Sequence, residues 1–125
     1  MEQKEIKNKL EEIKRQRSPD TFNVELEKQE INPLFDLLNN NKAKEAKEGA
    51  QKLLQTLKTK ESYVRLQLLL SYYYNKKTQL DSMTFYANNA LKGSESIKND
   101  SIRRILASGS YNLLGLANNK QGLFE

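Results

Sequence analysis

Apolar residues return at every third or fourth position through most of this chain, and no other feature constrains its fold as strongly. The clearest example is segment 42–59, where lysines and glutamates fill the opposite side and the periodic residues are Ala43, Ala46, Ala50, Leu53, Leu54 and Leu57. This is the period of an α-helix with one face turned to a core. Five glycines and two prolines are too few for the hairpin turns of an all-β chain. We therefore predict an all-α fold.

Turn and cap residues divide the chain into separate helices. Ser18-Pro19-Asp20 and Asn32-Pro33 each combine a capping side chain with a proline suited to the first helical position, so each predicts a helix start. Asn39-Asn40-Asn41 predicts a helix end, because asparagine tolerates the left-handed conformation found there. The other predicted helices are 42–59, 62–77, about 80–98, and 101–119, the last capped by Asn99-Asp100-Ser101 and preceded by a turn near Thr78-Gln79.

A further helix is predicted at residues 4–16, where Ile6, Leu10 and Ile13 form one narrow apolar stripe among charged residues. We expect it to cap or dock onto the rest of the chain; a short coiled coil is the alternative. The predicted organisation is therefore a charged N-terminal region, 1–31, followed by a helical domain, 32–125.

The helix at 62–77 is apolar nearly all round, which is typical of a helix packed between others. Its tyrosines Tyr72, Tyr73 and Tyr74 point in three directions, because consecutive helical residues diverge. We therefore interpret them as core and groove lining and not as a platform for stacking nucleic-acid bases.

The composition argues against several kinds of chemistry. Without cysteine there is no disulfide, thiolate nucleophile or Cys-based zinc site, and without histidine the commonest general base and metal ligand is missing. We expect no catalytic residue, metal or cofactor. The net charge of +5 is interleaved with acids, whereas a nucleic-acid interface would usually show a clustered basic stripe. No run approaches the ~20 apolar residues of a membrane span, and no signal peptide is visible, so we expect a cytoplasmic chain without membrane contact.

The last stretch has an aromatic residue, a Leu-Gly pair and a Gly-x-aromatic turn, and an earlier stretch matches this hairpin pattern in part, with Ser71 and Thr78 in place of the two glycines. The matching residues are Tyr111, Leu114, Gly115, Gly122 and Phe124 in the last stretch, and Leu70, Tyr74, Ala90 and Leu91 in the earlier one. In this pattern the chain resembles the tetratricopeptide repeat (TPR) family, in its extended-repeat form. The resemblance implies antiparallel helical hairpins stacked as a right-handed solenoid, with helices crossing closely at Ser71 and Gly115. It also implies a tight turn at Gly122 and a second helix that begins at Leu123.

The same resemblance implies a non-catalytic module that binds a protein or peptide in a groove lined by the first helices of its hairpins. The residues placed in that groove are Arg65, Leu68, Tyr72, Asn75, Lys76, Gly109, Asn112, Leu116, Asn119 and Lys120. The alternative is a sensory or dimerising segment of a larger bacterial signalling or transcription regulator. A nucleic-acid binder or an enzyme is the more remote alternative.

The end of the chain leaves the helix at 101–119 without its usual cover. We expect an exposed apolar face that includes some of Leu106, Tyr111, Leu114 and Leu116. The prediction is that the chain is the N-terminal part of a longer TPR-containing protein, or that this end is buried by self-association.

Overall fold

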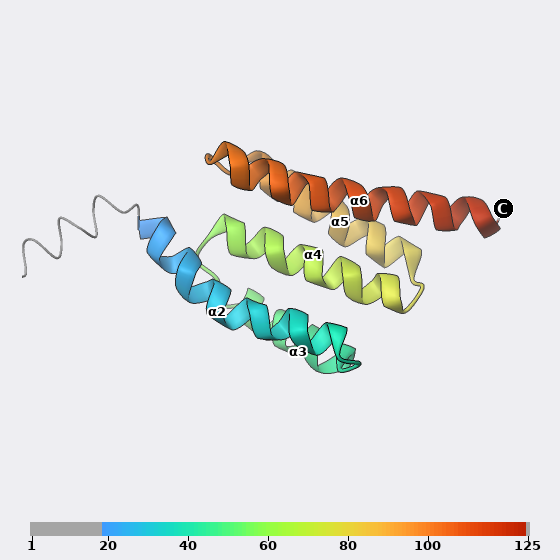
Figure 1. Ribbon diagram of the computed structural model, residues 1–125, viewed down its shortest axis with the longest axis horizontal. Coiled ribbons are helices and arrows are strands. Elements are labelled where there is room, and N and C mark those ends of the chain that lie inside the picture. Colours follow the sequence, from blue (N-terminus) through green and yellow to red (C-terminus); the bar gives the residue numbers. More distant parts are fainter. Residues whose placement is uncertain (1–18, 125) are drawn as a thin grey trace, which may run out of the picture.

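The computed structural model describes residues 19–124 (Figure 1). This part of the chain forms α2 (Pro19–Asn39), α3 (Ala43–Leu54), α4 (Lys60–Lys76), α5 (Leu80–Glu95) and α6 (Asp100–Phe124). No strand is present among these residues, so the all-α prediction is confirmed. The helix predicted at residues 4–16 lies outside the described residues. No helix in the range 19–124 combines the length and the apolar character needed to cross a membrane.

Helix α4 lies in the middle of the molecule, with α2 and α3 on one side and α5 and α6 on the other (Figure 1). It contacts all four of these helices. The prediction that this nearly all-apolar segment is packed between others is confirmed, and its boundaries differ from the predicted 62–77 by two residues or fewer.

Two hydrophobic clusters share α4. The first lies between α2, α3 and α4 and contains Ile31, Leu38, Ala46, Ala50, Leu66, Leu69, Leu70 and Tyr73. The second lies between α4, α5 and α6 and contains Val64, Leu68, Met83, Ala87, Ala90, Leu106, Leu113 and Ala117. Half-buried Tyr72 and Tyr74 pack against both clusters. The fully buried alanines let the helix axes approach, as small side chains do.

Two of the predicted helix ends are left-handed, which the residue type indicated for Asn41 but not for Thr78. Asn41 has a φ of 64° after α2, and Thr78 has a φ of 56° after α4. Helix α3 ends at Leu54, about five residues before the predicted end at Thr59.

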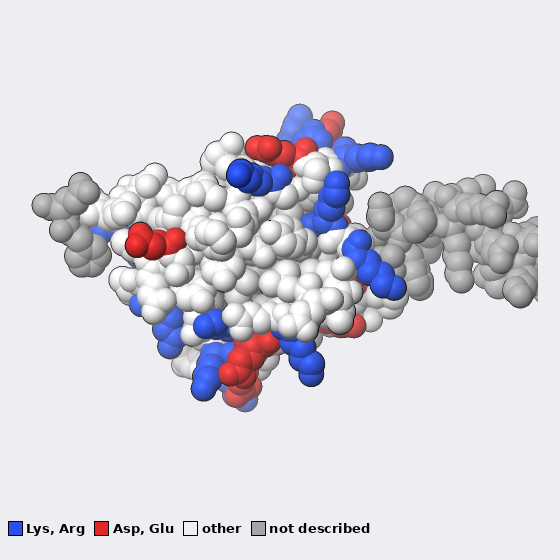
Figure 2. Space-filling model, turned by 180° about the vertical axis from the view of Figure 1, so that it is seen from behind, with Lys and Arg blue, Asp and Glu red and all other residues white. Residues whose placement is uncertain are grey.

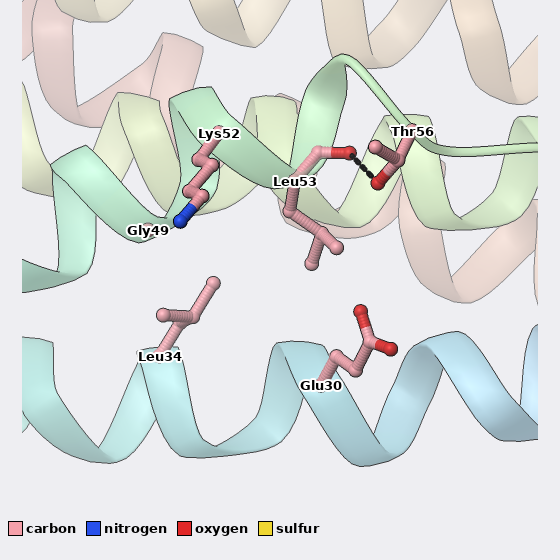
Figure 3. Close-up of a pocket in the computed structure, with 6 residues that line it drawn as sticks. All are labelled: Glu30, Leu34, Gly49, Lys52, Leu53 and Thr56. Atoms are coloured by element: carbon pink, nitrogen blue, oxygen red, sulfur yellow. Dashed lines mark hydrogen bonds between the residues drawn. The ribbon is translucent and has the colours of Figure 1, made fainter.

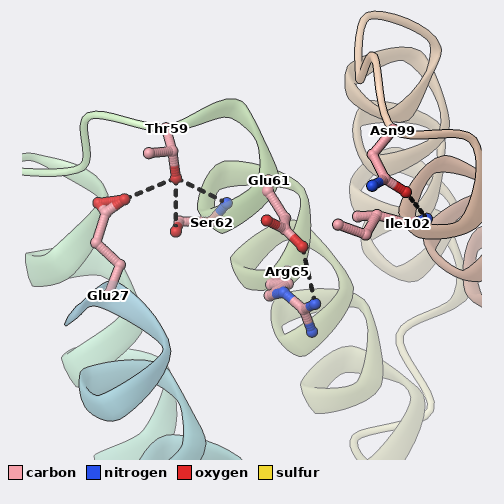
Figure 4. Close-up of polar contacts among 7 residues, drawn as sticks. All are labelled: Glu27, Thr59, Glu61, Ser62, Arg65, Asn99 and Ile102. Carbon is pink, nitrogen blue, oxygen red and sulfur yellow. Dashed lines mark hydrogen bonds and ion pairs between the residues drawn. The ribbon is translucent and has the colours of Figure 1, made fainter. Parts of the chain in front are cut away.

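Polar contacts hold the linker that connects α3 to α4 (Figure 4). The Glu27 carboxylate of α2 accepts the backbone N–H of Lys58 at 3.2 Å and the hydroxyl of Thr59 at 2.7 Å. Thr59 also caps α4, because its hydroxyl accepts the N–H of Ser62. The carboxylate therefore fixes the linker against α2.

The predicted helix start at Asn32-Pro33 is wrong, because α2 runs without a break through Pro33. Proline lacks the N–H that would bond to the preceding turn. Ile31 and Leu38 lie on either side of it, and both are almost completely buried in the first cluster. Burial of this one face favours a continuous helix over the local preference of proline. The boundary predicted between residues 31 and 32 falls inside α2.

The turn predicted at Gly122 is also wrong, since α6 continues through it to Phe124. Gly122 does not have the positive φ that such a turn would need. The close helix crossing predicted at Gly115 is wrong as well, because no atom of another helix comes within 4 Å of a Cβ placed there. The crossing predicted at Ser71 is confirmed: Ser71 is fully buried, and its hydroxyl donates to the Met83 carbonyl of α5 at 2.8 Å.

Candidate binding surface

The two rows of residues predicted to line a binding site lie side by side on α4 and α6. The Lys120 ammonium of α6 donates a hydrogen bond to the Asn75 amide oxygen of α4. Farther along the pair, a Cβ placed on Gly109 of α6 would lie 3.5 Å from Leu68 of α4. These contacts join positions more than forty residues apart in the sequence. We call the surface formed by Arg65, Tyr72, Asn75, Lys76, Asn112, Leu116, Asn119 and Lys120 the α4–α6 surface.

Leu68, also predicted as a binding residue, does not belong to this surface. It is 7% exposed and packs in the second cluster with Leu106 and Leu113. A leucine at this depth stabilises the fold and offers almost no area to a ligand. The prediction of a direct binding role for Leu68 is therefore wrong.

The members of the α4–α6 surface differ in how freely they could contact a partner. Lys76, Asn112, Leu116 and Asn119 are exposed, whereas Arg65, Tyr72, Asn75 and Lys120 are half-buried. The Arg65 guanidinium pairs with the Glu61 carboxylate one turn earlier, at 3.0 Å (Figure 4). Arg65 is thus paired within α4, and Lys120 is half-buried. Lys76 is therefore the most exposed of the three cations of this surface.

A pocket of about 330 Å³ lies elsewhere, between α2 and α3 (Figure 3). Its lining residues are Glu30, Leu34, Gly49, Lys52, Leu53 and Thr56. Gly49 lets Leu34 lie against α3, since a Cβ there would come within 2.5 Å of a Leu34 methyl group. Two of its lining side chains, Glu30 and Lys52, carry opposite charges. We interpret this pocket as a gap between two surface helices.

An aromatic cluster joins α3, α4 and α5. Tyr74 and Tyr86 stack nearly parallel with ring centroids 5.4 Å apart, and Phe85 and Tyr73 meet this pair edge-on. The Lys47 ammonium lies 5.1 Å from the Tyr73 ring centroid and 5.4 Å from that of Tyr74, within cation–π range. The Tyr74 hydroxyl, as a hydrogen-bonding partner, raises the pKa of Lys47.

Burial raises the pKa of Tyr86 above its ordinary value of 10.0, and neighbouring Tyr74 raises it further, while Lys47 opposes the shift. Phe85 remains 59% exposed at the edge of the cluster. The α5 side of the cluster carries no charge of its own, because α5 has no charged residue between Asp81 and Lys92, and the cations over the rings, Lys47 and Lys77, come from outside α5. Viewed from behind, charged side chains gather toward the margins and leave the middle of this face uncharged (Figure 2).

The outward side of α6 is the second surface without charge. Residues 105–119 contain no Asp, Glu, Lys or Arg, and Ile105, Tyr111 and Leu116 are 67%, 62% and 43% exposed. The predicted exposure is confirmed for Tyr111 and Leu116. These are two of the four residues of which some were expected to be exposed; Leu106 is 3% exposed and Leu114 is half-buried.

Two candidate residues, Ile105 and Lys47, were not predicted from the sequence. Ile105 could have been found, because Ser101, four positions before it, and Ser108, three positions after it, lie on the same uncharged face of α6. Lys47 could not, since only the packing of three helices brings it over the tyrosines. Comparison of the chain with protein-family models, with curated proteins and with solved structures gives no match.

Proposed function

We propose that this chain is a non-catalytic helical module that binds an extended peptide or protein segment along the α4–α6 surface. The observation that carries the proposal is the contact between Lys120 and Asn75, which joins two rows of amide and basic side chains into one strip. Amides can hydrogen-bond to both the N–H and the C=O groups of an extended backbone. A strip of this kind suits a chain without regular structure of its own.

The charges of the strip favour an acidic partner. It contains Arg65, Lys76 and Lys120, and the acidic side chain beside it is Glu61, which is already paired with Arg65. Half-buried Tyr72 and exposed Leu116 add apolar area beside the amides. The proposed ligand is therefore a peptide with one or more carboxylates next to an apolar residue.

The proposal includes a helical-repeat relationship of the TPR type. Its support is the order of packing: α4 and α5 form an antiparallel hairpin, and α6 packs against both. A stacked repeat array would continue in the same way. The packing at Ser71 supports the relationship, and the open position at Gly115 does not.

Selection from a random peptide library against the purified chain tests the proposal. We expect the selected peptides to be enriched in Asp and Glu, and their affinity, measured by fluorescence polarisation, to fall with salt. Lys76→Glu and Asn112→Ala should each weaken binding about tenfold, because they reverse a charge and remove an amide in the strip.

Lys44→Glu is the matched control, because Lys44 is an exposed lysine of α3, on the other side of α4. Equal weakening by Lys44→Glu and Lys76→Glu would show that net charge alone drives binding. Binding unaffected by Lys76→Glu and Asn112→Ala would place the site elsewhere.

A further inference from the structure

The outward side of α6 has a seam of residues at alternating spacings of four and three. Its members are Ser101, Ile105, Ser108, Asn112, Gly115 and Asn119. This is the spacing by which two helices pack along their length. All six members are exposed, and none belongs to the core formed with α4 and α5. All except Gly115 carry a side chain.

The seam matches itself when a second copy is placed antiparallel with a two-fold axis level with Ser110. Ser101 then lies opposite Asn119, Ile105 opposite Gly115, and Ser108 opposite Asn112. Ile105, at 67% exposure, has the one apolar side chain among the six seam residues, and Gly115 has open space where a Cβ would be. The Ile105 side chain of each copy therefore lies over Gly115 of the other, and the two-fold axis makes this contact occur twice.

Charge favours the same occupant and the same orientation. A partner on residues 105–119 buries no charge of α6, and the same stretch of a second copy brings none of its own. Parallel pairing would place Arg104 of one copy beside Arg104 of the other. Antiparallel pairing separates these arginines. It also places the positive N-terminal end of each helix dipole beside the negative C-terminal end of the other.

We propose that two copies of this chain associate through an antiparallel α6–α6 pair with Ile105 of each copy over Gly115 of the other. Tyr111 and Leu116 flank the seam and add apolar area at its sides. The proposal does not require peptide binding, but the two surfaces overlap: Asn112, Leu116 and Asn119 belong to both, so a peptide bound on the α4–α6 surface would compete with the dimer.

Sedimentation velocity of the full chain over a wide concentration range tests the association. We expect a reversible dimer that Ile105→Lys weakens at least tenfold, because it places a charge against an uncharged partner. Phe85→Lys is the matched control: Phe85 is 59% exposed on α5, and its replacement should leave the dimer intact. A monomer at all concentrations overturns the proposal, and so does a dimer that Ile105→Lys does not weaken.

Cysteine cross-linking tests the register, and the chain has no cysteine of its own to interfere. A mixture of Ile105→Cys and Gly115→Cys chains should form a mixed disulfide on mild oxidation. Ile105→Cys alone should not, because two copies of position 105 would lie roughly 15 Å apart along the helices, beyond the ~7 Å that a disulfide spans. Efficient cross-linking of Ile105→Cys with itself overturns the antiparallel pair. These substitutions are small and on the surface, so this result stands even if Ile105→Lys disturbs folding.

Discussion

Gly93→Ala and Gly115→Ala should change stability in opposite directions, although both replace a helical glycine with the best helix former. In either helix the exchange gains about 0.5–1 kcal/mol from backbone entropy. At Gly115 nothing lies within 4 Å of the new methyl group, so we expect the whole gain. At Gly93 the methyl group would lie 2.7 Å from a Val64 methyl group.

Val64 cannot give way cheaply. It is completely buried in the second cluster, and a β-branched side chain in a helix has essentially one rotamer. The misfit should cost about 1–3 kcal/mol, as overpacking usually does. Because the gain in helix propensity is common to both variants, the difference between them is this packing cost.

Urea unfolding followed by circular dichroism, at one low protein concentration, measures that difference. For a chain of this size about 1–3 kcal/mol corresponds to melting temperatures roughly 4–12 °C apart. The stability of Gly49→Ala should lie between those of the other two variants. The new methyl group would meet a terminal methyl group of Leu34, whose flexible, half-buried side chain can move aside. Equal stabilities for Gly93→Ala and Gly115→Ala would refute the placement of α5 against α4.

Three further changes probe the packing, the capping and the aromatic cluster. Ser71→Leu should cost about 1–3 kcal/mol or more in urea unfolding, because the site is fully buried and the bond to the Met83 carbonyl is lost. Asn99→Ala should cost about 1 kcal/mol, because the Asn99 side chain accepts the N–H of Ile102 at the start of α6; Lys98→Ala is the exposed control (Figure 4). Tyr86 has a raised pKa, so its contribution to stability is present below pH 10.0 and is lost as the pH rises through the higher folded value. Unfolding free energies at about pH 8 and about pH 11 should therefore fall less for Tyr86→Phe than for the unchanged chain, and equal falls would contradict the assignment.

The sequence predicts those parts of the fold that depend on one helix at a time. The apolar residues all round α4 indicate a helix packed on several sides, and Asn41 and Thr78 end helices as their positions suggest. Where local preference and burial disagree, the prediction fails. Pro33 has the local features of a helix start, yet its neighbours Ile31 and Leu38 belong to one buried face, and only the cluster in space shows this.

The candidate surfaces were predictable to a similar extent. Helical spacing places Asn75 and Lys76 on one side of α4, and Asn112 and Lys120 on one side of α6. Their contact across the two helices depends on how far one helix is shifted along the other, which no spacing within a helix determines. The same holds for Gly115, where a family pattern predicts a close contact and the helix rotation leaves the position open.

The position of α4 bears on how this chain folds. Leu66 and Leu69 of α4 build one cluster and Val64 and Leu68 the other, so neither half of the molecule keeps a core without this helix. Its partners are near neighbours in the sequence, and chains dominated by such local pairings fold rapidly. We expect the two halves to unfold together in a single transition, with hydrogen exchange slowest in α4 and its backbone opening only when the whole chain does.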